Sequence, residues 1–242
     1  DGNQGRITIE EAPGASIDHR NADRYDRGRG EPPRAPGRRT EHGMPVSGET
    51  IRPQAGDALI VTDVQNDFLP GGSLAVPRGD EVVPVLNRYI AVFRRPALPV
   101  VATRDWHPPD HCSFKAQGGP WPPHCIAGSD GARFASRLDI PAGCRIVSKA
   151  TARDKEAYSS FEGTDLDAWL KETGVARRFI GGLATDYCVL NSVRDALRLG
   201  YATFVLRDAV RAVDVNAGDG ERAAEEMRRL GARDIEFSEI AS

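Results

Sequence analysis

The chain has 242 residues, of which 40% are hydrophobic and 28% charged, and its formal net charge is −3. This length accommodates one large domain with a sizeable core. The near balance of charge excludes the overall basic field by which many proteins hold nucleic acid or an anionic membrane, so no nucleic-acid or membrane partner is expected. A small-molecule substrate is predicted instead, and the sequence leaves a homo-oligomer open.

The sequence also bears on location. No apolar run approaches the roughly 20 residues that a membrane-spanning helix needs, and residues 1–43 contain no apolar stretch typical of a signal peptide. The four cysteines form no close CxxC pairs, so they are expected to remain thiols in a reducing compartment. A cytoplasmic protein is therefore predicted.

Residues 1–55 are rich in Arg, Gly, Pro and acidic side chains, with almost no apolar clustering. Such a composition cannot bury enough apolar surface to offset the entropy lost on ordering. This segment is predicted to be a disordered or non-native tail, and residues 56–242 a single folded domain. Because the chain opens on Asp1 and its first methionine is Met44, one hypothesis places the tail upstream of the natural start.

From residue 57 onward, short apolar runs rich in β-branched residues alternate with amphipathic stretches. The predicted strands are residues 58–63, 99–105, 144–150, 178–184, 202–208 and, more weakly, 234–238. The predicted helices are residues 80–95, 164–173, 186–199 and 219–230. This alternation predicts an α/β fold: a doubly wound, Rossmann-like, mostly parallel six-stranded sheet with helices on both faces. Ligands of such sheets bind beyond the carboxyl ends of the strands.

Four chemically capable side chains follow the ends of the first four predicted strands: Asp63, Asp105, Lys149 and Cys188. Each alone is equally consistent with a cap, a solvated charge or a core residue. Lys149, however, is one of only four lysines among 32 basic residues, and a buried ammonium shifts its pKa readily. The shared sheet edge predicts that these residues lie close together.

Cys188 falls in the first turn of a predicted helix, after the small residues of "GGLATDYC". Unpaired backbone N–H groups and the positive end of the helix dipole favour a thiolate there, and the same groups could hold an oxyanion. A nucleophilic thiol also needs a proton acceptor and a charge partner. Asp63 and Lys149 are the candidates, which makes an Asp/Lys/Cys triad.

The stretch "ATRDWHPPDHC" at residues 102–112 raises a metal site as a second possibility. Asp105 and His107 are two residues apart, so they face the same side if the chain stays extended. His124, in "WPPHC", could supply a third ligand and leave coordination positions open, as catalytic sites do. Two alternatives remain: a structural zinc knot that includes Cys112 and Cys125, and a metal-free loop.

Together these residues resemble the isochorismatase-like cysteine hydrolases, and within them the nicotinamidase/pyrazinamidase family. The resemblance runs through residues 57–238. It is carried by six motifs in order, which are "DVQNDFLPGGSLAV" (63–76), "TRDWHPPDHCSF" (103–114), "WPPHC" (121–125), "SKA" (148–150), "AYSSFEGT" (157–164) and "GLATDYCV" (182–189). The resemblance implies a six-stranded parallel sheet.

The resemblance also implies roles for individual residues. It maps the catalytic triad onto Asp63, Lys149 and Cys188, with the backbone N–H groups of Ala184 and Cys188 as the oxyanion hole. It implies a cis peptide just before Ala184.

By the same resemblance, one divalent metal ion, which is Zn, Fe or Mn, binds to Asp105, His107 and His124, with His111 as a possible fourth ligand. Three aromatic residues match the substrate pocket: Phe68 and Trp121 sandwich the ring, and Tyr158 lines the wall.

The implied reaction is the hydrolysis of nicotinamide, a linear carboxamide, to nicotinate and ammonia in pyridine nucleotide salvage, with pyrazinamide as a further substrate. A first alternative is another amidohydrolase of the superfamily that acts on a carbamoyl or ureido compound. Those relatives generally keep the triad but lack the metal ligands. A second alternative is a non-catalytic metal-binding module.

Overall fold

The computed structural model describes residues 50–241, so most of the predicted tail lies outside the described residues. Within the described part, Ile51 is buried. Its N–H donates to the Glu239 carbonyl at 2.7 Å, and its own carbonyl accepts from the Ala241 N–H at 2.8 Å. Ile51, which lies before the boundary predicted at residue 56, therefore pairs with the C-terminal segment.

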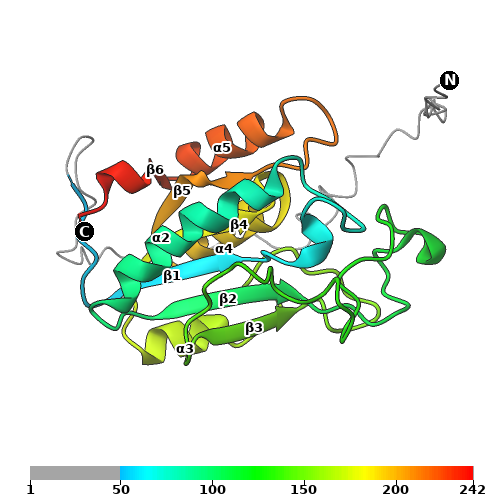
Figure 1. Cartoon of the computed structure of the whole chain (residues 1–242), viewed down its shortest axis with the longest axis horizontal. Helices are drawn as coiled ribbons and strands as arrows, with labels where there is room; N and C mark the ends of the chain where they lie inside the picture. Colours follow the sequence, from blue (N-terminus) through cyan, green and yellow to red (C-terminus); the bar gives the residue numbers. More distant parts are fainter. Residues whose placement is uncertain (1–49, 242) are drawn as a thin grey trace, which may run out of the picture. The chain divides into compact units, whose positions relative to one another are not determined.

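The centre of the domain is one six-stranded sheet in which every strand pairing is parallel (Figure 1). Its order is β3-β2-β1-β4-β5-β6. The strands are β1 Asp57–Thr62, β2 Val100–Asp105, β3 Arg145–Lys149, β4 Arg177–Leu183, β5 Ala202–Arg211 and β6 Arg233–Ile235. The predicted sheet is confirmed. Strand order reverses between β1 and β4, which is where a doubly wound sheet opens a crevice for a ligand.

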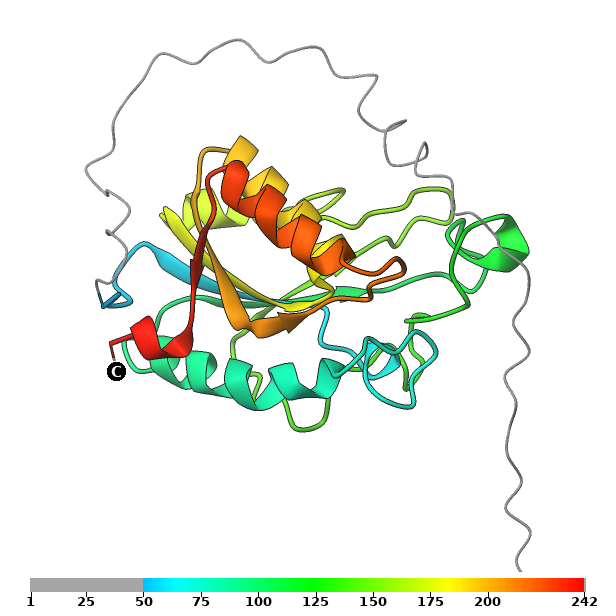
Figure 2. The same ribbon diagram turned by 90° about the horizontal axis from the view of Figure 1, so that it is seen from above.

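Helices cover both faces of the sheet, as predicted (Figure 2). Figure 2 shows α2 on one face and α4 and α5 on the other. The helices are α2 Val82–Arg94, α3 Leu166–Glu172, α4 Leu190–Arg198 and α5 Asp219–Arg229. Short helical turns are η1 Asn66–Phe68, η2 Gly79–Glu81, η3 Lys115–Gln117, η4 Thr185–Val189 and η5 Phe237–Glu239. Among the described residues no helix is long and apolar enough to cross a bilayer.

Two apolar cores follow from this layering. One contains the buried side chains between α2 and its face of the sheet, among them Leu86, Phe93 and Phe179. The other lies under α3, α4 and α5 and contains Leu170, Val193 and other aliphatic residues. Buried on both faces, the central strands are nearly continuous apolar runs, which is why the sequence marks them clearly.

The central strands β1 and β4 approach closely near their carboxyl ends. A Cβ added to Gly182, whose φ is +125°, would lie 2.0 Å from the Thr62 carbonyl oxygen. Only glycine fits there. The pairing of β4 with β5 shifts register between Ile180 and Gly182, and β5 runs longer than predicted, to Arg211. These features shape the edge of the sheet at which the predicted site residues lie.

Candidate active site

Asp63, Lys149 and Cys188 meet at the carboxyl edge of the sheet, where β1, β3 and β4 end. They are 0%, 1% and 5% exposed. Lys149 Nζ lies 3.1 Å from Asp63 Oδ2 and 3.4 Å from Cys188 Sγ, and the Cys188 sulfur lies within 4.8 Å of an Asp63 carboxylate oxygen. The structure thus brings the three predicted residues into mutual contact.

The backbone turns sharply just after two of these strands, and this aims the side chains. Asp63 follows β1 with a left-handed φ of 49°, and Ala150 follows Lys149 with a φ of 51°. Such angles are uncommon for residues with a Cβ and often occur at functional sites. Thr103 of β2 fixes the result, because its hydroxyl donates to Asp63 Oδ1 at 2.6 Å.

Burial governs the protonation of the triad. It raises the pKa of Asp63, and the neighbouring Lys149 ammonium offsets this only in part. It lowers the pKa of Lys149, but Asp105 and Asp63 outweigh it, so the ammonium stays charged. Burial also raises the pKa of the Cys188 thiol well above its usual range. Burial and the nearby carboxylates thus favour the protonated thiol, against the helix terminus that favours a thiolate.

Cys188 is carried by a short helical turn that directly follows β4. Ala184 is the N-cap of the π-helical turn η4, and its carbonyl accepts from the N–H groups of Tyr187 and Val189, both at 3.1 Å. The peptide bond between Leu183 and Ala184 is cis, as the resemblance implied. Ala184 and Cys188 both line the pocket described below, and the oxyanion-hole role of their N–H groups stays a prediction.

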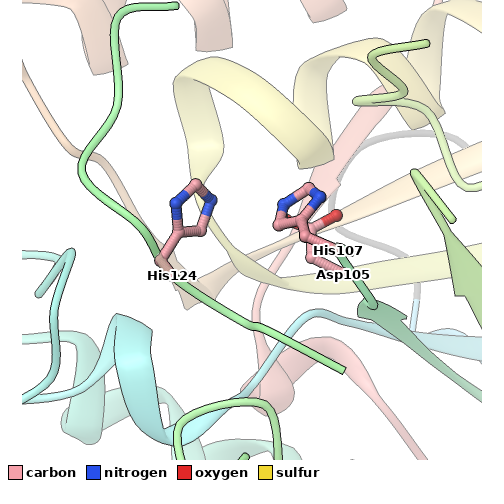
Figure 3. A group of neighbouring side chains, drawn as sticks. All are labelled: Asp105, His107 and His124. Carbon is pink, nitrogen blue, oxygen red and sulfur yellow. The ribbon is translucent and has the colours of Figure 1, made fainter. Parts of the chain in front are cut away.

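A second cluster, of Asp105, His107 and His124, lies beside the triad (Figure 3). All three residues are buried, and their ligand atoms lie within 4.8 Å of one another. Asp105 closes β2, His107 follows it, and His124 reaches over from the loop between β2 and β3. Asp105 also accepts a hydrogen bond from Lys149, which links the cluster to the triad.

Hydrogen bonds set the histidine tautomers in this cluster. His107 Nδ1 lies 3.3 Å from the Ala150 carbonyl, and His124 Nδ1 lies 2.8 Å from the Pro122 carbonyl. A ring nitrogen that faces a carbonyl must carry the proton, so both Nε2 atoms present lone pairs. His107 Nε2 is buried and has no hydrogen-bond partner among the described residues. Orientation of a ligating imidazole by its other nitrogen is typical of metal sites.

The charges of the cluster also suit a metal. Burial lowers the pKa of His107 to about 4 and lowers that of His124 as well, so both rings are neutral near pH 7. Burial raises the pKa of Asp105, but Lys149 and His107 outweigh it and hold the pKa below its usual value. One carboxylate and two neutral imidazoles fit Zn, Fe or Mn and leave coordination positions open.

His111, the possible fourth ligand, lies beside this cluster and outside its ligand set. Its ring centroid is 4.2 Å from that of His107. However, Nδ1 lies 2.8 Å from Ser113 Oγ, and Nε2 lies 3.0 Å from the Lys155 carbonyl. Because a carbonyl needs a donor, Nε2 carries the proton here, and ligation by His111 stays a prediction.

The zinc-knot alternative has no counterpart in the described part of the chain, since neither Cys112 nor Cys125 joins a group that could hold a metal. Cys125 is buried, and burial raises its pKa far above the usual range. It is therefore a thiol within the core. Both cysteines are free.

A pocket adjoins both clusters. Its lining comprises Phe68, Leu74, Asp105, Trp121, His124, Tyr158, Ala184, Tyr187, Cys188 and Val213. All three predicted aromatic residues are present, and Trp121 Nε1 donates to the Tyr158 hydroxyl at 3.0 Å.

Three residues of this lining were not predicted from the sequence: Leu74, Tyr187 and Val213. Tyr187 is adjacent to Cys188, and its ring contacts that of Trp121 edge-on at 5.0 Å. The N–H of Val213 is held at 3.0 Å by the carboxylate of Asp186. The signal for Tyr187 was its place in "TDYC", whereas Val213 arrives through a tertiary contact that no local pattern shows.

Comparison with known proteins gives a family match over most of the domain. The model of the isochorismatase domain matches residues 57–236. A nicotinamidase of Escherichia coli is 38% identical over 196 residues, which are 72% of this chain and 92% of the relative.

Two solved structures are similar in fold as well as sequence. A pyrazinamidase of Pyrococcus horikoshii in complex with zinc is 49% identical, with a TM-score of 0.72 over 75% of this chain and 99% of that one. PnC1 of L. infantum in complex with nicotinate is 34% identical, with a TM-score of 0.73 over 77% of this chain and 96% of that one.

Proposed function

The chain belongs to the isochorismatase family, and from that premise we propose that it is a metal-dependent nicotinamidase that hydrolyses nicotinamide to nicotinate and ammonia. The observation that carries the proposal is the shared pocket. Cys188 lies on it together with the aromatic residues Phe68 and Trp121 and two members of the metal cluster, Asp105 and His124. A nucleophile, aromatic walls and two candidate metal ligands therefore line one pocket.

The first half of the reaction forms a thioester. Asp63 takes the proton from Cys188 Sγ, and the thiolate attacks the carboxamide carbon. The backbone N–H groups of Ala184 and Cys188 hold the developing oxyanion. As the C–N bond breaks, Asp63 returns the proton to the leaving nitrogen, and ammonia departs. The raised pKa of Asp63 suits this exchange, because it brings the carboxyl closer to the operating pH.

The second half of the reaction restores the enzyme. Asp63 takes a proton from water, which attacks the thioester carbonyl. As the C–S bond breaks, Asp63 returns this proton to the Cys188 sulfur, and the released nicotinic acid ionises to nicotinate. Lys149 stays charged throughout, because Asp63 and Asp105 both raise its pKa. Its ammonium compensates the negative charge that moves between Asp63 and Cys188.

Asp105, His107 and His124 would hold one divalent ion, for which we propose zinc, with iron and manganese as the alternatives. The ion would supply a Lewis acid that anchors the pyridine nitrogen, directly or through a bound water. Phe68 and Trp121 would then sandwich the ring, so that its carboxamide lies at Cys188. The zinc complex of the Pyrococcus horikoshii relative supports this choice of metal.

Three finer proposals concern the rest of the protein. All four cysteines, Cys188 included, are free thiols, and this favours a cytoplasmic enzyme. The catalytic domain is proposed to comprise residues 56–242, extended upstream by the segment around Ile51. The partner is the small-molecule substrate, since the charge balance offers no basic field for nucleic acid.

The proposal is tested by product analysis with purified, zinc-loaded protein. Nicotinamide and pyrazinamide should each yield ammonia and the matching acid. Carbamoyl and ureido compounds should be poor substrates, because they offer no ring nitrogen to a metal. Preferred turnover of a ureido compound would favour the first alternative function, and turnover of neither class would favour a non-catalytic module.

A further inference from the structure

The chain beyond Asp63 reaches across to the loop that carries His124. Backbone hydrogen bonds join the two segments: Asp67 N to the Gly131 carbonyl at 3.0 Å, and Ala135 N to the Val64 carbonyl at 3.0 Å. Three polar side chains follow β1 along this path, at positions 63, 65 and 67. Asp63 belongs to the triad, whereas Gln65 and Asp67 are polar, buried and unused by the mechanism above.

Gln65 hydrogen-bonds both the N–H and the carbonyl of Asp105, a proposed metal ligand. It is fully buried, its Nε2 donates to the Asp105 carbonyl at 2.8 Å, and its Oε1 accepts from the Asp105 N–H at 2.8 Å. The same Nε2 also lies 3.0 Å from the Ala132 carbonyl, in the His124 loop. Gln65 therefore fixes the peptide groups of Asp105 as a neighbouring strand would.

Asp67 binds the other ligand segment. Its Oδ2 accepts from the Cys125 N–H at 2.7 Å, directly after His124, and its Oδ1 accepts from the Ser73 N–H at 3.2 Å. Cys125 has a left-handed φ of 47°, so the chain turns sharply at this point. The carboxylate thus holds the turn that aims the His124 ring.

Gly131 shows how closely this carboxylate is enclosed. A Cβ added at Gly131 would lie 2.0 Å from Asp67 Oδ2 and 2.3 Å from Asp67 Cγ. The backbone of Gly131 is not in the left-handed region, so an alanine there would act through this contact alone and force the Asp67 carboxylate to shift. The loop therefore closes tightly over Asp67.

We propose that Gln65 and Asp67 are positioning residues of the metal centre, a role that rests on the proposed metal-dependent function. Gln65 fixes Asp105, and Asp67 fixes His124. Since both extend from the strand end that holds Asp63, one segment keeps the catalytic carboxylate and the two metal ligands in register. Ligands held by outer hydrogen bonds bind metal more tightly than loose ones, because less order is lost on binding.

The test measures zinc affinity by competition with a chromogenic chelator, using the full chain stripped of metal. The variants are Asp67→Asn, which keeps shape but turns one oxygen into a donor, and Gln65→Met, which removes all three contacts. Each should weaken zinc binding by about 10- to 100-fold. Gly131→Ala should weaken it similarly, although it leaves both side chains chemically intact. Ammonia release by Asp67→Asn should recover in excess zinc, which a merely structural defect would not do.

The matched control is Asp208→Asn. Asp208 likewise accepts a backbone N–H, from Phe237 at 3.0 Å, and a hydroxyl, from Tyr89 at 2.9 Å, but it does not line the pocket. Its zinc affinity should stay within about twofold of wild type. Thermal unfolding of every variant shows, independently of zinc affinity, whether the variant is folded.

Three outcomes would overturn the proposal: wild-type zinc affinity in Asp67→Asn and Gln65→Met, an equal loss in Asp208→Asn, or a wild-type protein that binds no zinc. If instead the affinities follow the prediction but nicotinamide yields no ammonia, the positioning role stands and the proposed substrate is wrong. The two proposals therefore fail separately.

Discussion

The two ends of the sheet hold buried ions in different ways. At the amino end, Arg177 of β4 donates to both carboxylate oxygens of Asp57 of β1, each at 2.6 Å. In this ion pair, one cation matches one carboxylate. At the carboxyl end, the single ammonium of Lys149 is shared by Asp63, Asp105 and the Cys188 thiol. There two carboxylates compete for one cation.

This difference separates stability from chemistry within the same two central strands. In the Arg177–Asp57 pair, the two carboxylate oxygens already accept hydrogen bonds from the guanidinium, so they are not available to a ligand. The carboxyl end keeps unsatisfied capacity, namely the bare Nε2 of His107 and a thiol beside a carboxylate whose pKa is raised. Changes at the carboxyl end should therefore abolish turnover, whereas changes at the amino end should lower the free energy of unfolding.

The largest effect is expected from Cys188→Ala, which removes the nucleophile. Ammonia release from nicotinamide should fall by at least about 10³-fold, while circular dichroism stays that of wild type. The control is Cys144→Ala, a half-buried thiol just before β3 at the amino end, which should keep full activity. Equal activity in Cys188→Ala would remove the basis of the mechanism.

Lys149→Met should come next, with kcat lower by about 10²- to 10⁴-fold. Without the ammonium, the carboxylates of Asp63 and Asp105 face each other directly, and each raises the pKa of the other. Asp63 would then keep a proton and could not accept the one from Cys188. Steady-state kinetics on folded protein measures this, and a variant with unchanged kcat would show that Lys149 has only a structural role.

Metal removal should affect the carboxyl end alone. Chelation should lower ammonia release by about 10²-fold, because the substrate ring loses its anchor, and zinc should restore it. Zinc at a hundredfold excess over its Kd should also raise the free energy of unfolding by about 2.7 kcal/mol. Calorimetry with and without zinc measures this, and a His107→Ala variant should show no zinc-dependent shift in Tm.

Arg177→Met tests the amino end. Loss of one partner leaves the Asp57 carboxylate buried without its cation, which should lower the free energy of unfolding by about 3 to 5 kcal/mol. Activity per folded molecule should be unchanged, because Arg177 lies at the opposite end of the strands from Cys188. Urea denaturation with parallel kinetics measures both quantities. A large fall in kcat without loss of stability would contradict the division between the two ends.

The smallest effect is expected from Val213→Ala in the pocket lining. Loss of two methyl groups should raise KM for nicotinamide by roughly fivefold, with kcat little changed, since the apolar Val213 side chain takes no part in the proton transfers. A fall in kcat with unchanged KM would instead place Val213 among the residues that orient the carboxamide.

Much of the fold was predictable because its strands are buried on both faces and separated by amphipathic helices. The polar residues at strand ends were predictable for a related reason: charge at the end of a buried apolar run stands out. The register shift opposite Gly182 and the added length of β5 were not predictable, because both result from pairing between strands. Ile51 was missed because a lone isoleucine in a polar segment gives no periodic signal.

The site divides in the same way. Asp63, Lys149 and Cys188 could be proposed from position and from motifs, whereas the protonation of Cys188 could not. Its thiol pKa depends on burial, which the sequence does not show. Gln65 lies within the motif that identified Asp63. Its contact with the Asp105 backbone spans 40 positions of the chain, so only the structure shows it.

The central claim is that Cys188 at the carboxyl end of the sheet forms a thioester with nicotinamide. Hydroxylamine added during turnover tests it most directly, because it intercepts an acyl-enzyme and yields the hydroxamate of nicotinic acid in place of nicotinate. Wild-type protein should give the hydroxamate in proportion to the hydroxylamine concentration, and Cys188→Ala should give none. Continued nicotinate release with no hydroxamate at any concentration, or hydroxamate formation by Cys188→Ala, would contradict the account.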